Sequence, residues 1–137
     1  MNSIFLFFLS FIFFCCSDSL TNYYEIELDK EFNLRVGESA VISGYGVCIK
    51  FDSVAEDSRC PSELVCIWAG NAKSVFELKN SSGKHQTIYL NTHLEPKQIE
   101  FSKLTFYLKE LNPYPQKLEF IEQSDYVAKL VVKKKEN

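Results

Sequence analysis

The cysteines carry most of the chemistry that this sequence could perform. Cys60 and Cys66 are separated by Pro-Ser-Glu-Leu-Val, a turn-length insert that can bring their sulfur atoms together. In an exported protein, a disulfide is the leading interpretation of so close a pair. Closing this short loop would add only about 2–2.5 kcal/mol of stability, so the bond would mainly stiffen the loop. Cys48 has no evident partner in the sequence, and we expect it to be a half-buried free thiol in a strand.

A metal site and a catalytic site are the rival interpretations. Zinc sites usually show paired short spacings such as C-x-x-C, which this sequence lacks, and His85 and His93 are isolated among polar neighbours. We therefore expect no metal and no cofactor. The sequence also contains no G-x-S-x-G, H-E-x-x-H or P-loop. Glu56 and Asp57 are adjacent and would point to opposite faces of a strand, so the sequence predicts a protein that is not an enzyme.

One connection, residues 52–72, concentrates distinctive side chains. Its sequence DSVAEDSRCPSELVCIWAGNA contains the single tryptophan, the paired cysteines and an arginine. Arg and Trp are enriched at binding hot spots, so Asp57, Arg59 and Trp68 are candidate partner contacts. In the structural alternative, Trp68 plugs one end of the fold, and Arg59 pairs with Asp57 or Glu56. We expect this alternative, with Trp68 mostly buried and with Arg59 and Asp57 at the rim.

The N-terminal segment has the features of an export signal. Residues 4–14 form an uncharged, apolar run with a single serine. A helix of that length spans about half of a bilayer core, which is typical of a signal-peptide h-region and too short for a membrane span. Cys16 follows the small Cys15, so we expect cleavage before Cys16, which would then carry a lipid. Ordinary cleavage after Ser17 or Ser19 is the alternative.

The rest of the chain must position these residues, and its pattern is that of strands. Apolar and polar residues alternate with period two, and no window has the pattern of an amphipathic helix. The clearest alternating runs cover residues 24–28, 32–36, 47–52, 72–79, 104–109 and 126–133. About seven or eight short strands at this spacing predict an all-β domain, a single small antiparallel sandwich or barrel. We therefore expect a signal peptide (1–15), a lipid-anchored polar tether (16–23) and a β-rich domain (24–137).

Composition supports one folded domain and excludes some partners. Hydrophobic residues make up 46% of the 137 residues, which is enough to form a core. The net charge of −3 gives no electrostatic surface for nucleic acid, so we expect no nucleic-acid partner.

Three segments resemble a family of small, uncharacterised bacterial lipoproteins. They are DSRCP…CIWAG with the preceding F-D-S-V, the later L-x-x-L-N-P-Y-P, and D-Y-x-A-x-L-V-V. The resemblance covers roughly residues 36–133 and implies a lipoprotein with a β-rich domain and a disulfide. It brings no catalytic residues. Cys48 departs from the family pattern, in which an ordinary strand residue occupies that position.

The leading functional hypothesis is a non-catalytic, envelope-anchored lipoprotein module that binds a protein or a saccharide through the disulfide loop. We expect it to be exported and held by its lipid on a bacterial membrane, facing the periplasm or the cell surface. The alternative is an inhibitor of secreted proteases of the chagasin type, because Ser43-Gly44-Tyr45-Gly46 faintly resembles one loop of those sandwiches. The remainder of that inhibitor motif is missing.

Overall fold

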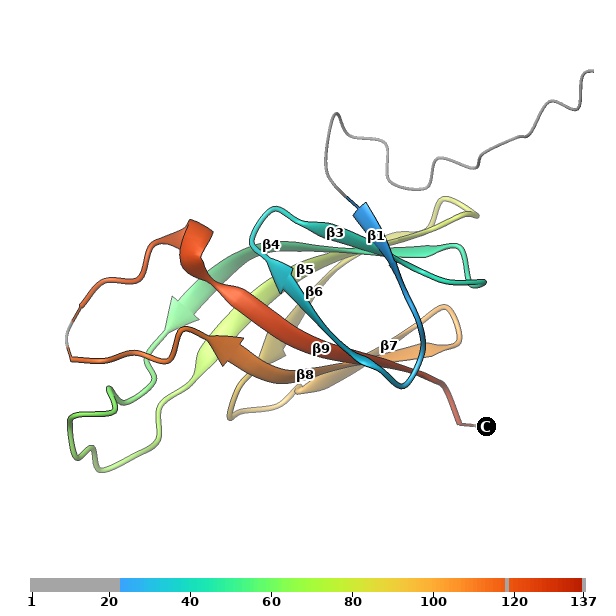
Figure 1. The fold of residues 1–137 in the computed structure, drawn as a ribbon. Coiled ribbons are helices and arrows are strands. Elements are labelled where there is room, and N and C mark those ends of the chain that lie inside the picture. The colour runs from blue at the N-terminus through green and yellow to red at the C-terminus, as the bar shows by residue number, and fades with distance from the viewer. Residues whose placement is uncertain (1–22, 118, 137) are drawn as a thin grey trace, which may run out of the picture.

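Two β-sheets packed face to face make up the domain (Figure 1). The computed structural model describes residues 23–117 and 119–136. In this part of the chain a five-stranded sheet has the order β1-β3-β4-β5-β6, and a four-stranded sheet has the order β2-β9-β8-β7. The prediction of a small all-β sandwich is confirmed. The strands are β1 (Tyr23–Ile26), β2 (Glu31–Arg35), β3 (Ser39–Ile42), β4 (Val47–Asp57), β5 (Ala72–Asn80), β6 (His85–Asn91), β7 (Gln98–Phe101), β8 (Leu104–Asn112) and β9 (Val127–Lys134), with one 3-10 turn, η1 (Gln123–Asp125).

The five-stranded sheet is mixed, because β1 and β3 pair in parallel. The strand between them in sequence, β2, pairs with β9 in the other sheet. The chain therefore leaves the five-stranded sheet after β1 and returns with β3 running in the same direction. The period-two pattern of the sequence does not indicate β3 or β7, because each strand has only four residues. In β3 the neighbouring residues Ser39 and Ala40 are also both buried, so apolar and polar residues do not alternate there.

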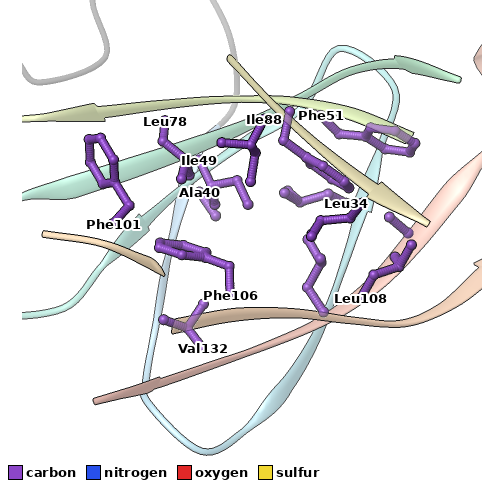
Figure 2. Packing of buried hydrophobic residues seen from close by; sticks show 14 of the residues in the cluster. Leu34, Ala40, Ile49, Phe51, Leu78, Ile88, Phe101, Phe106, Leu108 and Val132 are labelled. Atoms are coloured by element: carbon purple, nitrogen blue, oxygen red, sulfur yellow. The ribbon is translucent and has the colours of Figure 1, made fainter. Parts of the chain in front are cut away.

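The core lies between the two sheets (Figure 2). Inward-facing side chains of the five-stranded sheet, such as Ile49 and Leu78, point toward Phe106 and Val132 of the four-stranded sheet. The period-two spacing of apolar residues dictates this arrangement, because alternate side chains of a strand share one face. Full burial of each large apolar side chain contributes about 1.5–3 kcal/mol. None of the helices in the described residues is long and apolar enough to cross a membrane.

Two long connections extend from one end of the sandwich, at the left in Figure 1. They are residues 58–71, between β4 and β5, and residues 113–126, between β8 and β9. The tight turn at 43–46, between β3 and β4, lies at the other end of β4, which begins at Val47 and finishes at Asp57. We call the end that carries residues 58–71 the disulfide-loop end.

Candidate functional site

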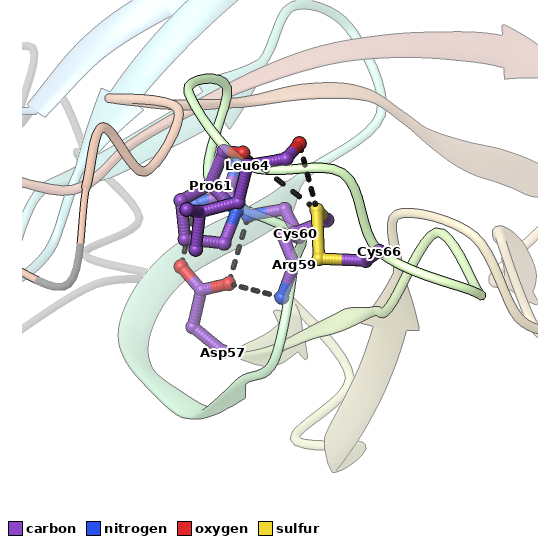
Figure 3. The surroundings of a disulfide bond; sticks show 6 residues. All are labelled: Asp57, Arg59, Cys60, Pro61, Leu64 and Cys66. Atoms are coloured by element: carbon purple, nitrogen blue, oxygen red, sulfur yellow. Dashed lines mark hydrogen bonds and ion pairs between the residues drawn. A yellow bond between two sulfur atoms is a disulfide. The ribbon is translucent and has the colours of Figure 1, made fainter.

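A disulfide closes the connection between β4 and β5, which we call the disulfide loop (58–71). Cys60 and Cys66 are bonded with their Cα atoms 6.0 Å apart (Figure 3), so the predicted pairing is confirmed. The backbone N–H of Cys60 also donates to the Ala69 carbonyl at 3.2 Å, and that of Leu64 donates to the Pro61 carbonyl at 2.9 Å. The loop therefore has a defined shape. Its two sulfur atoms are bonded to each other and are not thiolate ligands for a metal.

The guanidinium of Arg59 joins this loop to the other sheet. It forms a bidentate pair with Asp57, with Nε to Oδ1 at 2.8 Å and Nη2 to Oδ2 at 2.6 Å. The same group donates from Nη1 to the Leu111 carbonyl at 2.6 Å and from Nη2 to the Pro113 carbonyl at 3.0 Å. Its carbon Cζ lies 5.1 Å from the ring centroid of Tyr114. We call these contacts the Arg59 clasp; they fix the end of β4 to the end of β8 and to the segment that follows it.

Tyr126, just before β9, completes the clasp. Its hydroxyl donates to Oδ2 of Asp57 at 3.0 Å. Burial alone would raise the pKa of Asp57, but the hydrogen bonds and charge of Arg59, helped by Tyr126, outweigh it and lower the pKa. Burial and the neighbouring carboxylate raise the pKa of Tyr126 to about 12. Near neutral pH the carboxylate is therefore ionised and the phenol is protonated, and both are engaged in holding the chain.

The burial of this region differs from the sequence-based expectation in two ways. The sequence predicts a mostly buried Trp68, but the exposed fraction of this residue is 72%. It also predicts Arg59 and Asp57 at the rim, but their side chains are only 4% and 10% exposed. The physical reason is that the donors of Arg59 find a carboxylate and two carbonyls inside, which offsets the cost of burying its charge. Of the two partners that the sequence offers for Arg59, Asp57 and Glu56, the structure shows Asp57.

Two β-bulges bring Asp57 to this position. The pairing of β4 with β5 shifts register on both sides of Val54, so Val54 turns into the core and Asp57 lies opposite the buried Ala72. The side-chain amide of Gln123 supports the bulge, because Oε1 accepts from the Val54 N–H and Nε2 donates to the Val54 carbonyl, both at 2.9 Å. Gln123 is not among the residues predicted from the sequence, because a single amide in a loop gives no signal.

The glycine of the CIWAG segment permits a close approach of two chain segments. Gly70 has a φ of +71°, and a Cβ atom on it would lie 1.9 Å from the carbonyl oxygen of Ser58. The next residue, Asn71, accepts from the N–H groups of His93 and Leu94 through Oδ1, at 3.0 and 3.2 Å. Asn71 therefore holds the connection between β6 and β7 beside the disulfide loop. Asn71 is not among the predicted site residues either, although its position directly after the glycine is a signal.

A cleft of about 520 Å³ opens between the disulfide loop and residues 113–126. Its lining combines apolar side chains, Pro61, Pro115 and Phe120, with polar ones that include Lys117 and Glu119. Phe120 is 82% exposed. Asp57, Arg59 and Tyr126 also line the cleft, so the clasp that joins the two loops is part of its wall. Of the three candidate contacts from the sequence, the structure thus brings Asp57 and Arg59 together at the cleft and leaves Trp68 outside its lining.

Beyond the cleft, the loop ends in a set of exposed apolar side chains that we call the apolar tip: Leu64, Val65, Ile67 and Trp68. Charged residues are absent from the stretch between Glu63 and Lys73. None of the four tip side chains lines this cleft or the second cleft, of about 490 Å³, which runs past β6.

Cys48 does not fit its prediction as a free thiol. The residue is buried on β4 and is disulfide-bonded. Within the described residues, no group of three or more His, Cys, Asp or Glu side chains could hold a metal ion.

The three segments that carry the family resemblance meet at this end of the sandwich. Arg59 of DSRCP bonds the carbonyls of Leu111 and Pro113 in L-N-P-Y-P, and Asp57 bonds Tyr126 of D-Y. The motif residues thus have a structural role in joining the sheets. Comparisons with protein-family models, with curated proteins and with solved structures give no match.

Proposed function

We propose that the protein is an exported, envelope-anchored, non-catalytic module that binds a protein or a saccharide at the disulfide-loop end. The cleft between the disulfide loop and residues 113–126 carries this proposal. Its volume of about 520 Å³ lies in the range of small-ligand and peptide sites. The disulfide fixes the disulfide loop, and the clasp fixes Pro113 and Tyr126 at the two ends of residues 113–126. These restraints reduce the conformational entropy that is lost when a partner binds.

The chemistry of the cleft favours a protein segment over a saccharide. Pro61, Pro115 and the exposed Phe120 offer apolar contact. Lys117 adds one positive charge, and Glu56 and Glu119 add two negative charges. Aromatic and proline side chains in a groove suit the side chains of an extended peptide segment. Asp57 and Arg59 contribute by position, because their polar atoms are already bonded within the protein.

A non-catalytic role agrees with the electrostatics of the cleft. General acid or base catalysis near neutral pH needs a group whose pKa lies near the working pH. The pKa of Asp57 is lowered and that of Tyr126 is raised to about 12, so both pKa values lie further from neutral pH than those of the free side chains.

Anchoring is proposed from the sequence. The apolar run 4–14 and the small residue before Cys16 support export and lipidation, and both lie outside the described residues. The resemblance to small bacterial lipoproteins supports the same location. The protease-inhibitor alternative would use a different surface, because residues 43–46 lie at the opposite end of β4 from the disulfide loop.

A comparison of two variants tests the proposal. Phe120→Ala removes an exposed wall of the cleft, and Tyr45→Ala removes an exposed side chain from the opposite end. Immobilised protein is exposed to detergent-solubilised envelope and to purified envelope polysaccharide, and the retained material is compared. We expect Phe120→Ala to lose the retained protein and Tyr45→Ala to keep it. Equal retention by both variants contradicts the cleft as the contact surface, and loss of a retained polysaccharide instead identifies a saccharide partner.

A further inference from the structure

The apolar tip is unusual for a surface in contact with water. Val65 and Ile67 have exposed fractions of 104% and 96%, the largest of any large hydrophobic side chain that the structure describes, and Trp68 follows closely in sequence at 72%. A run of consecutive exposed apolar residues has no role in folding stability and generally marks an interaction surface.

The tip is also held in place. The Cys60–Cys66 disulfide closes a ring that contains Leu64 and Val65. Ile67 and Trp68 follow this ring, and the Cys60 N–H donates to the Ala69 carbonyl just after them at 3.2 Å. The Ser62 N–H donates to the Pro115 carbonyl at 3.0 Å, which fixes the loop to residues 113–126. Arg59 fixes the base of the loop. The side chains at the tip therefore stay exposed because the loop cannot fold back over them.

The side chains themselves indicate what covers them. Trp is enriched at the hot spots of protein interfaces, but Leu and Val, which make up half of this tip, are under-represented there. Protein interfaces also have about one hydrogen bond per 100–200 Å². The tip offers Leu64, Val65 and Ile67, with the indole N–H of Trp68 as its one side-chain hydrogen-bond donor. A saccharide, with its hydroxyl groups, finds still fewer partners there. Acyl chains need no hydrogen bonds, and Trp is enriched at the boundary between lipid and water.

We infer that the apolar tip inserts into the interfacial region of a lipid bilayer, with Val65 and Ile67 against the acyl chains and Trp68 at the headgroups. This goes beyond the proposed function, which concerns the cleft. Insertion is shallow, because backbone groups of the loop need water as a partner. The tip contains no basic residue and Glu63 precedes it, so neutral lipid suffices and anionic lipid adds nothing.

Trp68 supplies its own probe, because it is the single tryptophan of the chain. The full chain, with its disulfides intact, is reconstituted into phosphatidylcholine vesicles with or without bromine on the acyl chains. Tryptophan emission is then recorded. We expect the emission to shift to shorter wavelength and to be quenched by the brominated lipid. The quenching reports how deeply the indole of Trp68 lies in the bilayer, so the result does not depend on how the rest of the chain is attached to the vesicle.

Two variants show whether the tip drives insertion. Val65→Ser with Ile67→Ser keeps Trp68 and changes only exposed side chains, and it should lower the ratio of inserted to free tip by roughly tenfold per residue. Tyr45→Ser changes the other end of the domain, so the Trp68 fluorescence of this variant should be quenched as it is in the unaltered protein. The inference is overturned if Trp68 of the unaltered, vesicle-bound protein emits at the wavelength of a water-exposed indole and is not quenched by the brominated lipid. Shielding of Trp68 only by a protein partner overturns it equally. Neither result affects the cleft, which Phe120→Ala tests without lipid.

Discussion

The carboxylate of Asp57 and the guanidinium of Arg59, two residues apart in sequence, form a buried bidentate ion pair at 2.6 and 2.8 Å. The remaining guanidinium donors reach Leu111 and Pro113 in the other sheet. A pair that is local in sequence therefore links distant parts of the chain.

Replacing Arg59 with Met should destabilise the protein by about 3–5 kcal/mol, because Asp57 would remain buried without its counter-charge. Chemical unfolding in urea measures this loss. Lys129→Ala is the matched control, since the exposed Lys129–Glu110 pair has the same 2.6 Å separation and should matter far less. If both changes cost the same, the clasp does not stabilise the fold.

Stability should depend on pH at both extremes. The folded-state pKa of Asp57 is lowered, so its contribution is present above about pH 4, the unfolded value, and is lost as the pH falls through the folded value. The folded-state pKa of Tyr126 is raised to about 12, so its contribution is present below about pH 10 and is lost as the pH rises toward 12. The free energy of unfolding in urea, measured across pH, reports both contributions. In the Tyr126→Phe variant this free energy should fall less between pH 10 and pH 12. A Tyr126→Phe profile that is unchanged above pH 10 would exclude Tyr126 as its source.

Gly70→Ala should cost about 1–3 kcal/mol or more, because the new Cβ would overlap the Ser58 carbonyl. Gly83→Ala is the control: it also has a positive φ, +85°, but no atom lies within 4 Å of the new Cβ. That change should cost only about 1 kcal/mol of backbone strain. Unfolding free energies compare the two, and equal losses would show that the contact with Ser58 is relieved by movement of the loop.

Trp68→Ala should change stability by less than about 0.5 kcal/mol, as is usual for exposed side chains. Phe76→Ala, in the core, should cost about 3–5 kcal/mol. Thermal unfolding separates the two outcomes. A large loss with Trp68→Ala would restore the interpretation of Trp68 as a plug at the end of the sandwich.

Cys16→Ser should release the protein from membranes, whereas Cys15→Ser should not, because Cys16 is the predicted lipid acceptor. Fractionation after export measures this. Non-reducing peptide mapping of the exported protein gives an independent check on processing. A Cys48 peptide linked to Cys15 or Cys16 would contradict lipidation, because cleavage removes Cys15 and the lipid occupies the Cys16 sulfur as a thioether.

The sequence by itself determined the class of fold and the disulfide. Period-two alternation specifies strands because alternate side chains share a face, and it assigns Ile49, Leu78 and Phe106 to apolar faces, which the fold buries in the core. The five-residue spacing of Cys60 and Cys66 is a local property, so it too could be predicted.

Only the tertiary structure decided which side chains at the disulfide-loop end are buried. Arg59 lies inside because the carbonyls of Leu111 and Pro113, more than fifty residues away in sequence, accept hydrogen bonds from its guanidinium. Trp68 lies outside, 72% exposed, in a loop that is fixed at its base by Arg59 and by the hydrogen bond from the Cys60 N–H to the Ala69 carbonyl. Burial of this kind depends on partners brought together from distant segments, and residue type and local spacing carry no information about those partners.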